Sequence, residues 1–203
     1  MKSNNFLFVI DNGHGGVING VPQTAGKRSP DFGDGVLYEG VSNRRIAAKV
    51  IEGLREACLN VRELVPEVED ISLRTRANRV NALARYNNVI LISIHSDAFH
   101  KESARGWSSW TYYGDTKSDK VATVLYKHAK KARVKVREDW SDGDPDKEAN
   151  FYILRRTNCP AVLVENLFMT NEKDYKTLKS EKGQDKLAKI IIESCKEIAQ
   201  NGL

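Results

Sequence analysis

The sequence is poor in cysteine and has no long apolar run, and each shortage excludes a class of protein. Its three cysteines, Cys58, Cys159 and Cys195, lie far apart, and none belongs to a C-x-x-C pair. A disulfide framework and a thiolate zinc site are therefore not expected, and buried thiols in a reducing compartment are favoured. No apolar run approaches the roughly 20 residues that cross a bilayer, so we expect no membrane span.

The amino terminus also lacks the features of a secretory leader. Lys2 precedes an apolar run over residues 6–10, which is shorter than the apolar segment of about 7–15 residues in a signal peptide. No small-residue cleavage site follows this run. We therefore expect synthesis in the cytoplasm without a signal peptide.

The remaining composition is that of an ordinary globular chain. A length of 203 residues suffices for one full-sized domain, and a second independent core is not expected. A net charge of +5 would favour an anionic polymer as partner, whether nucleic acid or cell wall. The chain has no basic helix and no interleaved aromatic motif, so a nucleic-acid binder is disfavoured.

Short apolar runs alternate with amphipathic stretches along the chain. Strands are expected at residues 6–10, 61–65, 89–94, 107–113 and 161–164. Helices are expected at about 42–59, at 73–84 after a cap at Ser72, at 121–128 and at 187–198. This alternation predicts an α/β fold: a single domain over residues 1–203, with a mostly parallel twisted sheet and helices on both faces. Residues 17–38 and 138–149 have no expected element, and loops of that length are commonly functional.

Three of the expected strands end in residues with unusual chemistry. The strand at 6–10 runs into Asp11-Asn12-Gly13-His14-Gly15-Gly16, the strand at 89–94 into His95-Ser96-Asp97, and the strand at 161–164 into Glu165-Asn166. Because the carboxyl ends of parallel strands share one edge of a sheet, two imidazoles and a carboxylate are expected to meet there. The glycine spacing matches neither of the common phosphate-loop patterns.

Each of these residues has a structural explanation when it is taken alone, but the set indicates a metal. The chain has four histidines, and the other two, His100 and His128, are interpreted as loop and helix-surface residues. Two histidines and one carboxylate with an open fourth position form a recognised catalytic zinc set. The carboxylate ligand could be Glu39, before a helix expected to open at about Ser42, or Glu165.

In their order along the chain, these motifs resemble those of the zinc-dependent N-acetylmuramoyl-L-alanine amidases. The matching pieces are IDNGHGG at 10–16, YEG at 38–40, Arg76 and Asn81, SIHSDA at 93–98, Gly106, and PAVLVENLFMTN at 160–171. The resemblance implies that His14, Glu39 and His95 are ligands of Zn²⁺ and that Glu165 is the catalytic carboxylate. The implied reaction is hydrolysis of the amide between the lactyl group of N-acetylmuramic acid and L-alanine of the peptidoglycan stem peptide.

The resemblance also carries expectations about the setting of the enzyme. Residues 26–30 and 149–152 are similar to a short, endolysin-like branch of the family that phages and prophages encode. Peptidoglycan is then the partner, reached after release or export, and no separate wall-binding domain is expected. Asn12 stands where proline is frequent and Asp97 where asparagine is frequent, and neither is a ligand position. Asp11 either orients a ligand imidazole or caps a turn.

Two other functions stay open from the sequence. A different zinc peptidase or amidase could use the same ligands on a non-wall substrate. A catalytically inactive wall-binding module is disfavoured, because the three ligands and Glu165 are all present.

Overall fold

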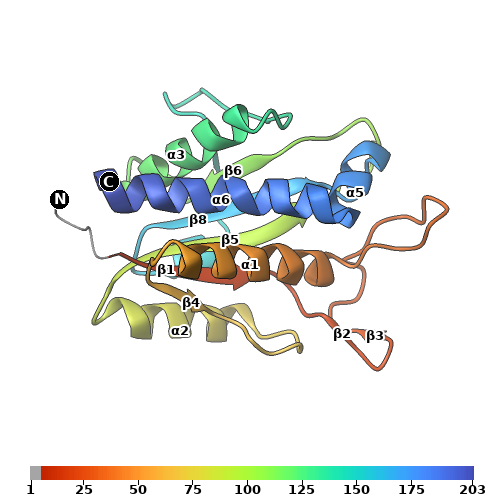
Figure 1. The fold of residues 1–203 in the computed structure, drawn as a ribbon, viewed down its shortest axis with the longest axis horizontal. Helices are drawn as coiled ribbons and strands as arrows, with labels where there is room; N and C mark the ends of the chain where they lie inside the picture. Colours follow the sequence, from red (N-terminus) through yellow and green to blue (C-terminus); the bar gives the residue numbers. More distant parts are fainter. Residues whose placement is uncertain (1–5) are drawn as a thin grey trace.

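A six-stranded sheet forms the middle layer of the protein, as a computed structural model of residues 6–203 shows (Figure 1). The strands follow the order β4-β1-β5-β8-β6-β7 across the sheet. Their bounds are β1 Phe6–Asn12, β4 Val61–Glu63, β5 Asn88–Asp97, β6 Ser108–Thr111, β7 Lys147–Glu148 and β8 Ala161–Phe168.

The sheet is mostly parallel, as predicted. Strands β4, β1, β5 and β8 are parallel neighbours. Strand β6 is antiparallel to β8 and carries β7 alongside it in parallel. The carboxyl ends of β1, β5 and β8 therefore lie at one edge. Strands β5 and β8 run farther than predicted, so His95 and Glu165 lie within their carboxyl-terminal halves rather than after them.

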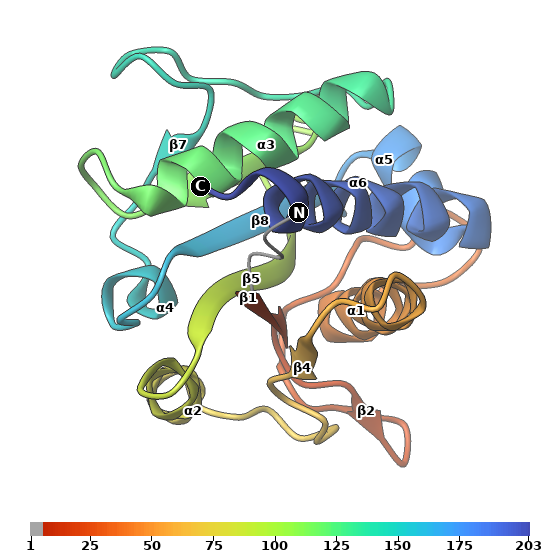
Figure 2. The same ribbon diagram turned by 60° about the vertical axis from the view of Figure 1, so that its left-hand side comes forward.

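Helices cover both faces of the sheet, which confirms the predicted α/β class (Figure 2). The helices are α1 Glu39–Glu56, α2 Leu73–Ala84, α3 Lys117–Lys131, α4 Tyr152–Arg155, α5 Glu172–Lys179 and α6 Glu181–Asn201. Phe8 and Ile10 of β1 face a core shared with α1, α3, α5 and α6. Val9, between them, faces a second core shared with α2 and α4. This alternation explains why β1 is apolar at nearly every position.

Several element boundaries differ from the prediction. Helix α1 begins at Glu39 rather than at about Ser42, because a polar first turn has no apolar periodicity to mark it. Strand β7 lies in the polar stretch 138–149, where pairing of Trp110 with Lys147 forms it rather than any apolar alternation. Helices α4 and α5 are too short to show a periodic stripe, and they were not expected.

The long segment 17–38 is an ordered part of the protein. It contains a hairpin of β2 (Val17–Ile18) and β3 (Val21–Pro22). Farther along, the Tyr175 hydroxyl of α5 donates to Asp34 Oδ1 at 2.7 Å and lies 2.6 Å from the Gly35 carbonyl oxygen. Within residues 6–203, no helix has both the length and the apolar character that crossing a bilayer requires.

Candidate metal centre

Two imidazoles and one carboxylate converge at the carboxyl edge of the sheet. His14 Nε2 lies 3.3 Å from Glu39 Oε2, and His95 Nδ1 lies 3.1 Å from Glu39 Oε1. The two rings are nearly perpendicular, with centroids 5.0 Å apart. One donor atom from each residue lies within 4.8 Å of the others. The structure thus brings together His14, Glu39 and His95, the three residues that the resemblance implies as ligands.

The backbone of His14 has an unusual conformation at this cluster. His14 has a positive φ of 66°, a region that residues with a side chain seldom adopt. The Arg44 guanidinium of α1 holds this turn by donating to the His14 carbonyl at 2.6 Å. Gly13 is required for packing, because a Cβ there would lie 2.2 Å from the His95 ring. The two histidines can approach each other only because Gly13 has no side chain.

Glu39 is fixed by contacts on both of its oxygens. Besides the two imidazoles, Oε1 accepts a hydrogen bond from the Ser96 backbone amide at 3.2 Å and a longer one from Asn43 at 3.4 Å. Asn43 lies one helical turn after Glu39 and also donates to the Gly13 carbonyl. Burial would raise the pKa of the Glu39 carboxyl, but the two imidazoles outweigh burial and hold this pKa well below its usual range.

Burial and Glu39 act on His95 in opposite directions. Burial lowers the pKa of the imidazole, whereas the hydrogen bond and charge of Glu39 raise it, and the net shift is upward. A cation bound to the ring nitrogen would replace the proton that this pairing now favours.

Glu165 lies beside the cluster on the neighbouring strand. His95 of β5 and Glu165 of β8 are directly paired across the two parallel strands, so their side chains leave the same side of the sheet. The pairing register shifts immediately afterwards, and Leu167 there has a positive φ of 70°. This β-bulge ends regular pairing next to Glu165, as bulges near functional sites often do.

The Glu165 carboxyl has the surroundings of a proton-transfer group. Its Oε2 atom is buried and has no hydrogen-bond partner among residues 6–203. Burial, with smaller contributions from the charges of Glu39 and Asp97, raises its pKa to about 8, although His95 opposes this shift. A carboxyl with a pKa near neutrality can both accept and return a proton at physiological pH.

Asp11 has a different role from the two that the sequence suggested. Its Oδ1 accepts from Arg76 Nη1 at 2.5 Å, and its Oδ2 accepts from the Ser93 hydroxyl at 2.6 Å. Arg76 also donates to the Asn12 carbonyl, and both members of the ion pair are almost fully buried. Within residues 6–203, no hydrogen bond joins Asp11 to either imidazole or to a turn amide. Asp11 therefore anchors the end of β1 to α2.

The cluster opens onto a hollow of about 330 Å³. Its lining includes His14 and His95, Thr24 of the long segment 17–38, and Ser72 and Leu73 at the start of α2. Thr24 is fixed there because its hydroxyl accepts from the Gly15 amide and donates to Asp70. Part of the segment 17–38 thus borders the metal cluster.

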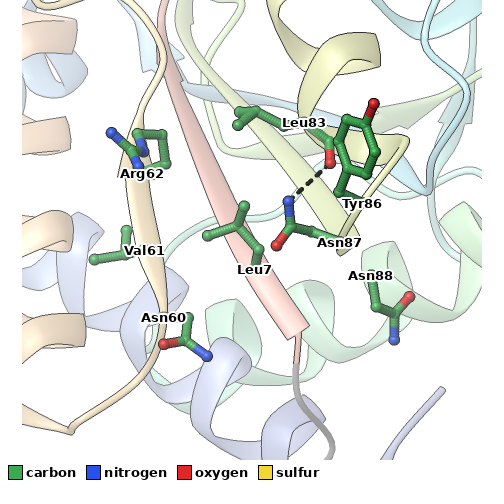
Figure 3. Close-up of a pocket in the computed structure, with 8 residues that line it drawn as sticks. All are labelled: Leu7, Asn60, Val61, Arg62, Leu83, Tyr86, Asn87 and Asn88. Atoms are coloured by element: carbon green, nitrogen blue, oxygen red, sulfur yellow. Dashed lines mark hydrogen bonds between the residues drawn. The ribbon is translucent and has the colours of Figure 1, made fainter.

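A larger hollow, of about 440 Å³, lies at the opposite end of the strands (Figure 3). It is lined near the starts of β1 and β5, by Leu7 and Asn88 among others. Asn87 donates there to the Leu83 carbonyl at 2.9 Å. Among residues 6–203, its lining includes neither a histidine nor a carboxylate. The lining side chains, rather than the volume of the hollow, therefore identify the candidate site.

The donor set fits a metal ion of the zinc type. Imidazole nitrogen and carboxylate oxygen are ligands that Zn²⁺ accepts, and three protein ligands leave a position for water or substrate. On the adjacent strand, Glu165 carries a buried carboxylate oxygen that has no hydrogen-bond partner within residues 6–203.

Sequence reasoning did not find Asn43 and Arg44, which hold Glu39 and the His14 backbone. The spacing of Asn43, four residues after Glu39, was the available signal, because residues so spaced share a helix face. Arg44 could not be identified from the sequence, because its partners are backbone carbonyls. His100 and His128 contribute nothing to the cluster, and His128 instead pairs with Glu197.

Comparison with known proteins finds a matching family. The family model described as N-acetylmuramoyl-L-alanine amidase matches residues 8–197. An N-acetylmuramoyl-L-alanine amidase of Bacillus subtilis is 30% identical over 185 residues, which is 90% of this chain and 33% of that protein. An endolysin of Bacillus phage SPP1 is 24% identical over 95% of this chain and 65% of its own length. The chain spans about half or less of the length of several curated relatives that it matches.

Two solved structures match over nearly their full length. The crystal structure of an N-acetylmuramoyl-L-alanine amidase from Clostridium difficile 630 superposes with a TM-score of 0.79 at 29% identity, covering 98% of this chain and 99% of that one. The catalytic domain of an amidase from Bacillus (Paenibacillus) polymyxa superposes with a TM-score of 0.78 at 25% identity, covering 96% and 98%. The fold is thus that of these amidase structures.

Proposed function

The chain belongs to the N-acetylmuramoyl-L-alanine amidase family, and from this premise we propose that it is a zinc-dependent hydrolase of peptidoglycan. The bond it cleaves is the amide between the lactyl group of N-acetylmuramic acid and L-alanine of the stem peptide. The observation that carries this proposal is the meeting of His14, Glu39 and His95 at the sheet edge, with Glu165 in register beside them.

His14, Glu39 and His95 would hold the metal. Glu39 faces both imidazoles in the structure, whereas Glu165 makes no hydrogen bond to either ring among residues 6–203, which supports Glu39 as the carboxylate ligand. When bound there, zinc supplies the Lewis acidity that polarises the scissile carbonyl and acidifies the attacking water.

Glu165 would move the protons of the reaction. Its Oε2 accepts the proton of the water that attacks the carbonyl carbon, and it then returns this proton to the nitrogen of L-alanine. The return is needed because an amine leaves as a neutral group and not as an anion. The pKa of about 8 lies close enough to neutrality for both transfers.

The neighbouring residues keep these groups in position. Asn43 and the Ser96 amide fix the Glu39 carboxylate, and Arg44 fixes the turn that carries His14. The buried pair of Asp11 and Arg76 ties the end of β1 to α2. Such support matters because small displacements of reacting groups reduce rates strongly.

The wall is also the proposed place of action. Relatives named as an endolysin and as a cell wall amidase support peptidoglycan as the substrate. The net charge of +5 favours encounter with an anionic polymer.

Digestion of purified sacculi tests this proposal against a peptidase or an inactive module. The proposal predicts new L-alanine amino termini without new reducing sugar ends. Amino termini of other residues would indicate a peptidase, and undigested sacculi with retained wall binding would indicate an inactive module.

A further inference from the structure

A second group of acidic side chains lies on other elements, away from the candidate metal centre. Asp119 is in the first turn of α3, Asp144 is in the loop before β7, and Asp146 immediately precedes β7. One carboxylate oxygen from each residue lies within 4.8 Å of the others. Three separate carboxylates at this spacing repel one another unless a proton or a cation lies between them.

Asp146 is the member of the cluster with a buried carboxylate oxygen that lacks a hydrogen-bond partner within residues 6–203. Only 2% of this residue is exposed. Its Oδ2 accepts from the Thr111 hydroxyl at 2.7 Å, but its Oδ1 is buried with no hydrogen-bond partner among residues 6–203. A buried carboxylate oxygen without a partner is unfavourable, so this atom points to a missing ligand.

No basic side chain balances the cluster. Within the described part of the chain, Asp119, Asp144 and Asp146 form no ion pair with lysine, arginine or histidine. The nearby Lys147 is paired instead with Asp139, at 3.9 Å. Burial, together with the adjoining Asp144 carboxyl, raises the pKa of Asp146 above its usual range. These surroundings favour either a retained proton or a bound cation.

We propose that Asp119, Asp144 and Asp146 bind a calcium ion, separate from the zinc ligands. The donors are all carboxylate oxygens, which hard cations prefer and which differ from the imidazole-rich set of the first centre. Calcium is favoured over magnesium because magnesium keeps most of its waters and usually takes one or two carboxylates, whereas three converge here.

The ion would link three parts of the fold. Asp119 accepts from the Thr116 amide in the capping box of α3. Asp146 is bonded to Thr111 at the end of β6, and its own amide donates to Asp144 Oδ1 at 3.2 Å. A cation shared by the three carboxylates would therefore join the polar segment 138–149 to β6 and to the start of α3.

The test is calcium titration of the zinc-loaded protein, followed by calorimetry and thermal unfolding. We expect about one calcium per chain, with zinc content unchanged by elemental analysis. At calcium 100-fold above its Kd, Tm should rise by about 5–10 °C. Asp146→Asn keeps the shape of the side chain and removes its charge, so it should abolish both the binding and the rise in Tm.

Two further variants keep the test decisive. Asp142→Asn lies in the same loop, but Asp142 is exposed and outside the cluster, so this variant should respond to calcium like the wild type. If Asp146→Asn does not fold, Asp144→Asn at the half-buried position replaces it. The proposal is overturned if calcium leaves the wild-type Tm unchanged, or raises it equally in the cluster variant. An unchanged Tm would mean that the carboxyls share a proton instead, and an equal rise would mean that calcium binds at another site.

Discussion

Replacing Glu165 by glutamine separates proton transfer from metal binding more sharply than any other single change. The amide has the size of the carboxyl but cannot take a proton from water and return it. Glu165 Oε2 has no hydrogen-bond partner in residues 6–203, so the substitution breaks no contact that the structure shows. The His14, Glu39 and His95 cluster should be left intact.

The expected loss of rate follows from the role of the residue. General acid/base groups contribute about 10²–10⁴-fold, so kcat should fall by that factor, which corresponds to about 3–5 kcal/mol in the activation barrier. KM should change little, because Glu165 is proposed to act on the water and the leaving nitrogen rather than on distant parts of the substrate.

The same substitution should stabilise the metal-free protein at neutral pH. The folded pKa of Glu165, about 8, lies above its ordinary value of 4.5. The protonated form of Glu165 therefore favours folding. Its contribution to the free energy of unfolding is lost as pH rises from about 4.5 through about 8. Glutamine cannot ionise, so the variant should avoid a loss on the order of 3 kcal/mol at pH 7.

The assay combines three measurements on the same preparation. Release of muropeptides from sacculi gives the rate, elemental analysis gives the zinc content, and thermal unfolding gives Tm with and without metal. Glu52→Gln, at an exposed position on α1, is the matched control and should behave like the wild type in all three.

Two results would refute this reasoning. Loss of zinc from Glu165→Gln would make Glu165 the carboxylate ligand in place of Glu39. Near-full activity with zinc retained would remove Glu165 from the mechanism.

Three other predictions follow from the buried contacts. His14→Ala and His95→Ala should each abolish zinc retention, measured by elemental analysis. The control His128→Ala, on α3, should retain zinc. Full zinc occupancy in either ligand variant would exclude that ligand. Arg76→Met leaves the buried Asp11 carboxylate unpaired and should reduce the free energy of unfolding by about 3–5 kcal/mol in denaturant titration, and a change below about 1 kcal/mol would contradict the ion-pair role. In the metal-free protein, the lowered pKa of Glu39 gives stability that is lost as pH falls below 4.5, and the raised pKa of His95 gives stability that is lost as pH rises beyond 6.5. Tm should therefore peak between these values, and a Tm that keeps rising above pH 7 without metal would contradict the pairing.

The overall fold could be predicted because the buried strands are strongly apolar. Strands such as β1 and β5 are covered on both faces, so residues 6–10 and 89–92 are all apolar, and this pattern predicts buried strands. Strand β7 and helix α4 could not be predicted in this way. Their positions depend on partners that are distant in the sequence, as in the pairing of Lys147 with Trp110.

The members of the candidate site could be predicted, but their supports could not. Apolar runs precede His14, His95 and Glu165, and parallel strands place such residues at a common edge. The choice between Glu39 and Glu165 as ligand rested on family resemblance alone, because spacing gives no information on which carboxylate faces the imidazoles. Asp11 was misread, because its partner Arg76 comes from a helix 65 residues away.

The most direct test of the proposed reaction follows the oxygen atom of water into the products. The zinc-loaded protein is incubated with a muropeptide in water enriched in oxygen-18, and the products are separated and examined by mass spectrometry. Hydrolysis of the proposed amide places one labelled oxygen on the lactyl carboxylate of N-acetylmuramic acid and none on the released peptide. Label in a peptide carboxylate, or at a new reducing sugar end, would show that this chain cleaves a different bond.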